Sequence, residues 1–209
     1  MYRNKEQLIR ENIKPGTTVL DVGFVGIGVG IAESEPASSH AVLKRMDGID
    51  LYGLDLDLPK EYRENPHYQA GNAENFNFPL KFDVIYAGDL IEHLSNCGLF
   101  LDSCRRNLKP GGIIILTTPN TFNLFSLAEK LTKREPTVNN DHTAYFNAPT
   151  LTKLLEKNNF RAEKVDYLYT LDIKFRQSFK KKVLNVLYWF LSLWTDKFIE
   201  TLVIIARPI

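Results

Sequence analysis

The sequence predicts an α/β fold in which a mostly parallel sheet carries helices on both faces. Three observations support this prediction. Short apolar runs at residues 17–22, 82–87 and 113–117 have the length and composition of buried strands. Segments of helical length lie between such runs, and glycine or acidic residues follow several strand ends. Alternating strands and helices favour parallel pairing, and ligands of parallel sheets bind at the carboxyl ends of the strands.

Length and composition are those of a single globular domain over residues 1–209. The 209 residues are 44% hydrophobic and 24% charged, which excludes the disordered and fibrous classes. A formal net charge of +1 gives no overall field that would attract nucleic acid. No apolar run reaches the roughly 20 residues of a spanning helix, and the first residues lack a signal-peptide pattern. We therefore expect a cytoplasmic protein. Cys97 and Cys104 lie two turns apart on one predicted helix, too far for a disulfide.

The first half of the chain is expected to hold two helices and three strands. A polar helix over residues 5–12 ends at a Lys-Pro-Gly run, because proline and glycine break helices. The apolar strand over 17–22 then enters a glycine-rich turn. A helix near 38–46 leads to a strand over 51–55 that an acid closes, and a short strand follows at 67–69.

The second half is expected to hold two helices and four strands. After the strand over 82–87, a helix over 96–108 ends at a Pro-Gly-Gly run, directly before the β-branched strand at 113–117. A helix over 148–159 is amphipathic, because its leucines fall on one face. Two final strands are expected at 162–168 and 200–206.

A glycine-rich loop and two polar side chains follow the strands in an order that indicates a nucleoside site. Glycines after Asp21 let the backbone turn sharply and approach a ligand without a Cβ in the way. The third glycine of a dinucleotide-binding loop is missing, because Ile31 or Glu33 stands at its position. Asp55 ends the second strand and can accept hydrogen bonds from both ribose hydroxyls, while Asn72 can contact the adenine edge.

Six segments together form one known pattern. They are VLDVGFVGIG at 19–28, YGLDLD at 52–57, GNAENF at 71–76, KFDVIYAGDLIEHL at 81–94, LKPGGIIILTTPN at 108–120 and FIETLVIIARP at 198–208. With them the chain resembles the class I S-adenosylmethionine-dependent methyltransferases over nearly its full length. The resemblance implies a Rossmann-like seven-stranded sheet whose last strand is antiparallel and lies beside residues 162–168.

The resemblance also implies S-adenosyl-L-methionine as the cofactor and assigns its contacts. Asp21 and Gly23 would contact the amino-acid part of the cofactor, and Asp55 would bind the ribose. Asn72 and Ala73 would flank the adenine. The full set of implied cofactor-binding residues is Asp21, Gly23, Phe24, Val25, Gly26, Asp55, Leu56, Asn72, Ala73, Glu74, Ala87 and Gly88.

The first loop departs from the family pattern at one position. Val25 occupies the place of the second glycine and Gly26 follows it, so the loop is either longer or reshaped around Phe24 and Val25. Two alternative functions therefore stay open. One is a non-catalytic protein that kept the fold, with these two side chains filling the site. The other is a nucleotide-dependent oxidoreductase, which the missing glycine disfavours.

Asp89, Glu92 and His93 follow the fourth strand and are the first catalytic candidates. Their spacing is similar to the acid-x-x-Glu-His motif of quinone-pathway O-methyltransferases and small-RNA 2′-O-methyltransferases, members of which bind magnesium with it. His142, in a polar loop, is a further candidate, and Asn120 is expected either to orient the substrate or to cap the strand end. Three roles stay open: a Mg²⁺ site, a histidine base, and positioning of the acceptor without a base.

An apolar insertion is expected at about 171–197. Basic residues precede VLNVLYWFLSLW at 183–194, and a helix there would be apolar on nearly every face. Packing onto the sheet, a homodimer face, and contact with a membrane surface or a lipid-linked substrate are the interpretations, while nucleic acid fits less well. The expected reaction is methylation of a small-molecule acceptor, on an oxygen of a sugar, a lipid-linked intermediate or a quinone-like phenol.

Overall fold

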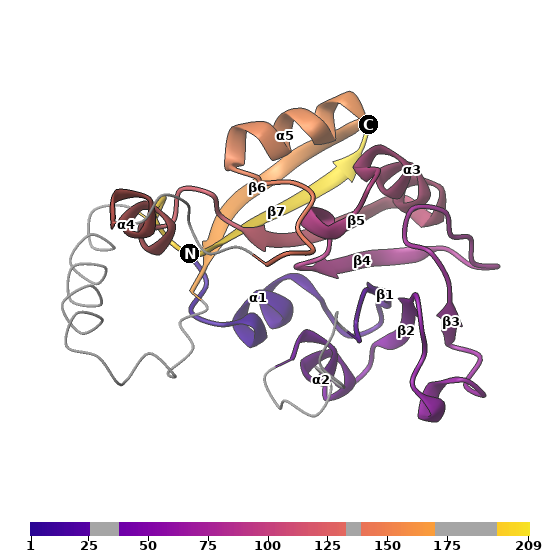
Figure 1. Ribbon diagram of the computed structural model, residues 1–209. Coiled ribbons are helices and arrows are strands. Elements are labelled where there is room, and N and C mark those ends of the chain that lie inside the picture. The colour runs from indigo at the N-terminus through magenta and orange to yellow at the C-terminus, as the bar shows by residue number, and fades with distance from the viewer. Residues whose placement is uncertain (26–37, 133–138, 170–195) are drawn as a thin grey trace.

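A seven-stranded sheet with the order β3-β2-β1-β4-β5-β7-β6 forms the centre of the computed structural model (Figure 1). The structure describes residues 1–25, 38–132, 139–169 and 196–209. Five strands, β1 to β5, pair in parallel, whereas β7 pairs antiparallel with both β5 and β6. The expected antiparallel last strand beside β6 is therefore confirmed. The strands are β1 (Thr18–Val22), β2 (Asp50–Asp55), β3 (Tyr68–Ala70), β4 (Phe82–Gly88), β5 (Leu108–Pro119), β6 (Phe160–Leu168) and β7 (Thr201–Pro208).

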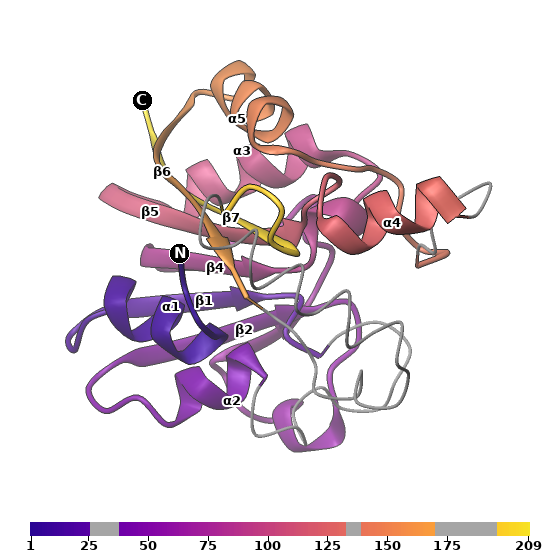
Figure 2. The same cartoon turned by 90° about the vertical axis from the view of Figure 1, so that its left-hand side faces the viewer.

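Helices cover both faces of the sheet, as the α/β pattern predicts. Helices α3 and α5 lie on one face, and α1 and α2 lie on the other (Figures 1 and 2). Asparagine or serine side chains cap the starts of these four helices by accepting a backbone N–H of the first turn. The helices are α1 (Lys5–Asn12), α2 (Ser39–Lys44), α3 (Cys97–Asn107), α4 (Leu124–Thr132) and α5 (Ala148–Lys157), with 3-10 turns η2 (Lys60–Tyr62) and η3 (Ile91–His93).

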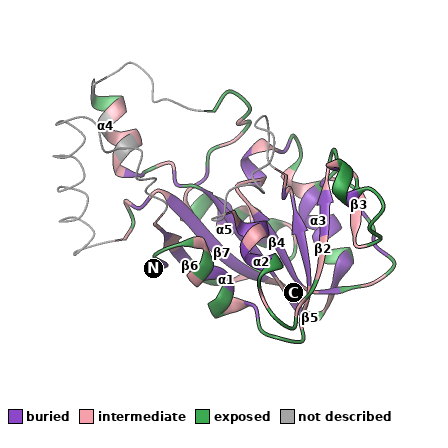
Figure 3. Ribbon diagram, turned by 90° about the horizontal axis from the view of Figure 1, so that it is seen from below, coloured by how far each residue is buried: buried purple, intermediate pink, exposed green. Residues whose placement is uncertain are grey.

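Alternate residues of the central strands belong to two apolar cores, one beneath each helical layer. In β5, Ile114 and Leu116 belong to the core under α3 and α5, while Ile115 belongs to the core under α1 and α2. These side chains are fully buried, and each contributes about 1.5–3 kcal/mol relative to exposure. Strands β4 and β7 are buried along most of their length (Figure 3). A continuous buried sheet therefore fixes where the strand ends, and the loops after them, lie.

Two elements differ from the sequence expectation. Strand β5 begins at Leu108 rather than at residue 113, because Leu108 pairs with Phe82 before a register shift, so the Pro-Gly-Gly run lies within the strand. Helix α4 was not expected; it follows β5 and projects beyond the sheet (Figure 1). The two cysteines are free thiols on α3, as expected.

Most of the predicted insertion at 171–197 lies outside the described residues. Its helical and interfacial character stays a prediction. Within the described ranges, no helix has both the length and the apolar character needed to cross a bilayer.

Candidate functional site

A cavity of about 290 Å³ lies at the carboxyl ends of β1, β2 and β4. This volume is at the lower end of the roughly 300–1,000 Å³ of ligand pockets. Helices α1 and α2 and the turn η3 complete its walls. Ten of the residues singled out from the sequence line it: Asp21, Gly23, Phe24, Asp55, Leu56, Asn72, Ala73, Gly88, Asp89 and His93.

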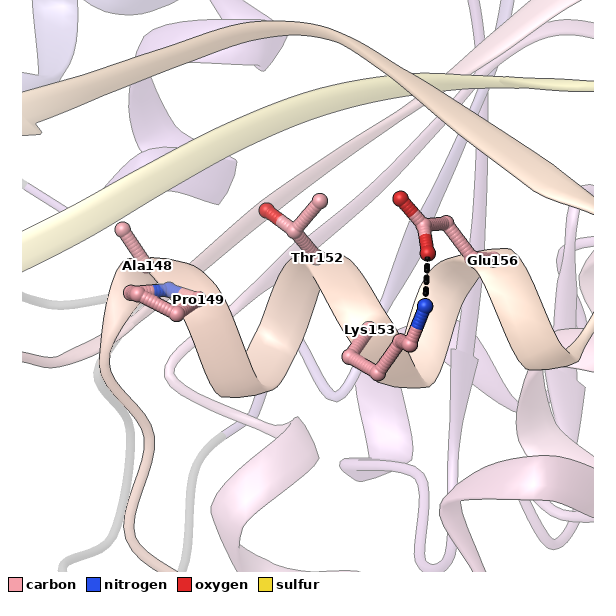
Figure 4. A pocket seen from close by; sticks show the side chains of 5 residues that line it. All are labelled: Ala148, Pro149, Thr152, Lys153 and Glu156. Carbon is pink, nitrogen blue, oxygen red and sulfur yellow. Dashed lines mark hydrogen bonds and ion pairs between the residues drawn. The ribbon is translucent and has the colours of Figure 1, made fainter.

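A second hollow, of about 510 Å³, runs along the outer face of α5 (Figure 4). All of its lining side chains belong to that one helix, and Lys153 donates to Glu156 across it at 2.7 Å. It is shallow and contains no residue from a strand end. The smaller cavity, where side chains from several strands converge, is therefore the candidate site.

Gly23 makes the turn out of β1 possible. Its φ of +77° is a conformation that residues with a Cβ rarely adopt, and its N–H donates to the Leu54 carbonyl at 2.8 Å. A Cβ at this position would lie 2.9 Å from Cδ1 of Leu90. The chain can therefore turn away from the cavity here without filling it.

Asp55 closes β2 with a carboxylate whose two oxygens are both held by backbone N–H groups. Val25 donates to Oδ2 and Leu56 donates to Oδ1, each at 2.8 Å. Burial raises the pKa of Asp55, and these backbone donors oppose the rise. Each carboxylate oxygen has a second lone pair, so two further hydroxyl donors can be accepted from the cavity. Val25 itself is not among the lining residues and acts through its backbone.

Asp21, one residue before the end of β1, is a nearly fully buried carboxylate, 2% exposed. Its Oδ2 lies 2.9 Å from Nδ1 of His40, on α2, and Nε2 of the same ring lies 3.1 Å from the hydroxyl of Tyr68. Phe24 stacks on the His40 ring, with 4.4 Å between the centroids. Phe24 therefore packs beside the cavity floor and does not fill the cavity.

The loop after β3 contributes a small apolar surface and a polar edge. Ala73 is buried and Asn72 lines the cavity, with its Oδ1 accepting the N–H of Glu74 at 2.9 Å. Glu74 faces away from the cavity lining, because its Oε1 accepts the Asn96 N–H at the start of α3. Ala87 is fully buried in the core and is also absent from the lining. Gly26 lies outside the described residues.

Asp89 connects three elements at the mouth of the cavity. It has a positive φ of 52°, and its side chain accepts Lys5 Nζ at 3.2 Å and the Thr117 hydroxyl at 3.1 Å. The Asp89 carboxylate raises the pKa of Lys5 to about 12 against the opposing effect of burial. Lys5 thereby links α1 to the end of β4, and Lys5 is one of the residues that line the cavity.

Glu92, His93 and His142 come together although 49 residues separate the two histidines in the chain. One ligand atom from each lies within 4.8 Å of the others, and the two imidazole rings meet edge to face at 4.6 Å. Thr143 brings the second segment in, because its N–H and hydroxyl both donate to the Glu92 carbonyl. Only His93 of the three lines the cavity.

Burial and missing hydrogen-bond partners shape the electrostatics of Glu92, His93 and His142. Burial and the nearby Asp89 raise the pKa of Glu92 to about 7, although Thr118 donates to its Oε2 at 2.9 Å. Glu92 Oε1 and His93 Nδ1 have no hydrogen-bond partner among the described residues. Burial and His93 lower the pKa of His142. Two orphaned atoms and a neutral imidazole fit either a bound divalent cation or a proton acceptor.

Asn120 serves the backbone and not the cavity. Its amide donates to the carbonyls of Lys197 and Ile199, each at 2.8 Å, and its Oδ1 accepts the Phe122 N–H. The side chain is 3% exposed. Of the two roles expected for Asn120, the geometry is that of the strand-end cap.

Sequence reasoning missed five polar or aromatic residues that line the cavity: Lys5, Ser38, Ser39, His40 and Tyr86. Lys5, Ser39 and His40 belong to α1 and α2, which were assigned only as covering helices. Tyr86 is an aromatic residue inside a strand, where burial in the core is the ordinary expectation. The single available signal was the polar Ser38-Ser39-His40 run at a helix start near the glycine loop.

The family described as a methyltransferase domain matches residues 3–165 of this chain. A ubiquinone biosynthesis O-methyltransferase of Nitrobacter winogradskyi is 31% identical over 113 residues, which are 52% of this chain and 41% of that protein. A probable S-adenosylmethionine-dependent methyltransferase of Mycolicibacterium smegmatis is 36% identical over 144 residues, 68% of this chain and 52% of that protein. The chain therefore spans about half the length of these two relatives.

Solved structures share the fold at low sequence identity. A SAM-dependent methyltransferase from Archaeoglobus fulgidus matches with a TM-score of 0.62 and 20% identity over 96% of this chain and 91% of that one. The 1,6-didemethyltoxoflavin-N1-methyltransferase of Burkholderia thailandensis, solved with S-adenosylhomocysteine, matches with a TM-score of 0.60 and 16% identity, over 98% and 76% of the two chains.

Proposed function

Because the chain belongs to the class I S-adenosylmethionine-dependent methyltransferases, we propose that it transfers the methyl group of S-adenosylmethionine to an oxygen of a small-molecule acceptor. The observation that carries the proposal is the pair of carboxylates, Asp21 and Asp55, that end adjacent strands on the wall of one cavity. A carboxylate at each strand end suits the cationic amino-acid part and the ribose of this cofactor.

Each part of the cofactor is proposed to meet a particular group of residues that line the cavity. Asp55 receives the ribose hydroxyls on the free lone pairs of its oxygens, and Asn72 and Ala73 face the adenine. Asp21 faces the cofactor's ammonium group. Lys5, which lines the same cavity, is the candidate partner for its carboxylate.

Methyl transfer from a sulfonium is an in-line displacement, so alignment of the two reactants supplies most of the catalysis. A hydroxyl acceptor must also lose its proton. Glu92, His93 and His142 stand beside the cavity mouth and serve this step. The lowered pKa of His142 keeps its imidazole neutral at pH 7, the form that accepts a proton.

The same three residues fit a divalent cation. Glu92 and His93 each have an unpartnered buried atom, and one ligand atom from each of the three residues lies within 4.8 Å of the others. A cation held there would lower the pKa of an acceptor hydroxyl. Adding Mg²⁺ or Mn²⁺ to chelator-treated protein should then raise the midpoint of thermal unfolding, and His142→Ala should abolish the rise. If neither cation shifts the midpoint, the cation site is ruled out, and the group serves as a base or positions the acceptor.

The names of the relatives support one acceptor class for the first assays. Relatives named ubiquinone biosynthesis O-methyltransferase match at 27–32% identity. A quinone-like phenol is therefore the first acceptor to assay, followed by sugar and lipid-linked hydroxyls.

Calorimetric titration with S-adenosylmethionine tests the proposal. Asp55→Ala should weaken binding at least tenfold, about 1.4 kcal/mol, because hydrogen bonds to a charged acceptor are lost. Asp57→Ala is the matched control: its side chain is 92% exposed and absent from the cavity, so its affinity should equal that of the wild type. Absence of binding to the wild-type protein would overturn the proposed function.

A further inference from the structure

His40 is a fully buried histidine whose two ring nitrogens both face polar partners beside the cofactor cavity. Its side chain is 0% exposed and lies on the first turn of α2. A carboxylate cannot donate, so Nδ1 carries the proton in the 2.9 Å contact with Asp21 Oδ2. In the neutral ring Nε2 is then an acceptor, and the Tyr68 hydroxyl at 3.1 Å donates to it. The contacts therefore select one tautomer.

An aromatic cluster holds this ring in place. Phe24 stacks on it, and the rings of Tyr62 and Tyr68 pack edge-on at 6.0 and 5.7 Å. Gly53 makes room for the cluster, since a Cβ there would lie 2.5 Å from Tyr68 and 2.8 Å from Phe24. Phe24, directly after Gly23, thus lies over the His40 ring.

We propose that His40 is a positioning residue of the cofactor site, which fixes the Asp21 carboxylate toward the cationic amino-acid part of S-adenosylmethionine. This inference rests on the proposed function. Asp21 and His40 both line the cavity, so the hydrogen bond between them orients a ligand-facing group. The hydrogen bond from Nδ1 occupies one lone pair of the Asp21 carboxylate and leaves the others for a cationic ligand. Tyr68 acts through the ring, by keeping its proton on Nδ1.

Two amide replacements separate positioning from packing. In His40→Asn the side-chain NH₂ can occupy the place of Nδ1 and still donate to Asp21. In His40→Gln the NH₂ extends toward the place of Nε2 and leaves Asp21 without this donor. Both variants lose the stacked ring, so a purely structural role would affect them alike. His67→Gln is a control outside the cavity, because the His67 side chain is 42% exposed and stacks on Tyr52.

The measurement is the dissociation constant of S-adenosylmethionine by calorimetry, with the thermal midpoint of each variant recorded alongside. His40→Gln should bind at least tenfold more weakly than the wild type, His40→Asn within threefold of it, and His67→Gln equally. Equal affinities of the two His40 variants would overturn the inference, whereas absence of binding to the wild type would overturn the proposed function with it.

Nitrogen-15 NMR of the wild-type protein tests the tautomer directly and needs no His40 variant. The His40 ring should show the neutral tautomer with its proton on Nδ1, and Tyr68→Phe should shift its Nε2 resonance. A His40 ring protonated on Nε2 alone would overturn the proposed hydrogen bond to Asp21.

Discussion

Replacing Gly53 with alanine should destabilise the protein although no polar group is removed. Gly53 lies in β2 opposite Tyr68 of β3. An added Cβ would lie 2.5 Å from Cδ1 and 2.7 Å from Cε1 of Tyr68, and 2.8 Å from Cε1 of Phe24. Unbonded carbon atoms pack at about 3.5–4.0 Å, so both rings would have to move by about 1 Å.

Both rings already pack against other aromatic rings. Phe24 is 6% exposed and stacks on His40, and Tyr62 lies 4.2 Å from Tyr68 between ring centroids. Forcing an extra methyl group into such packing costs about 1–3 kcal/mol. A displaced Tyr68 also loses its 3.1 Å contact with His40, which adds about 1 kcal/mol. The expected loss in the free energy of unfolding is therefore about 2–4 kcal/mol.

Urea denaturation at pH 7 measures this loss, and thermal unfolding should show a midpoint lowered by roughly 5–15 °C. Gly98→Ala is the control, because its Cβ would meet only the side-chain ends of Asn96 and Asn158, at 3.3 and 3.2 Å, and its stability should change by less than about 1 kcal/mol. A Gly53→Ala protein within about 0.5 kcal/mol of the wild type would refute the steric reasoning.

Three further predictions follow from single side chains. Asn120→Ala should lower the unfolding free energy by about 2–4 kcal/mol in urea titrations, because its buried amide donates to two backbone carbonyls, while calorimetry should show unchanged cofactor affinity. Burial alone would raise the pKa of Asp83, but the Lys109 ammonium and a backbone N–H of β1 outweigh it and lower this pKa. The Asp83 carboxylate therefore stabilises the fold above its unfolded-state pKa and loses that effect as the pH falls, so the stability difference between Asp83→Asn and the wild type should shrink from pH 7 to pH 3 in urea titrations. Burial raises the pKa of the Cys104 thiol well above its usual range, so a thiol reagent should modify Cys97 first in the native protein and both thiols after unfolding; equal rates in the native state would contradict this burial.

The order of strands and helices could be predicted from the sequence because it depends on short-range patterns. A buried strand such as β4 needs only a run of apolar residues, and a helix start such as α5 needs an asparagine cap followed by leucines on one face. The start of β5 could not be predicted this way. A Pro-Gly-Gly run ends a helix in most contexts, and only the pairing of Leu108 with Phe82 extends the strand backward.

The candidate site was likewise predictable from the sequence only in part. The sequence by itself determined that Asp21, Asp55 and Asp89 share one edge of the sheet, because parallel strands all end on the same side. Only the tertiary structure decided three contacts: the hydrogen bond of His40 with Asp21, the ion pair of Lys5 with Asp89, and the ring contact of His142 with His93. These contacts join residues from 19 to 84 positions apart. Local sequence patterns determine the order of the strands and helices. Which distant side chains come into contact depends on how the helices pack against the sheet.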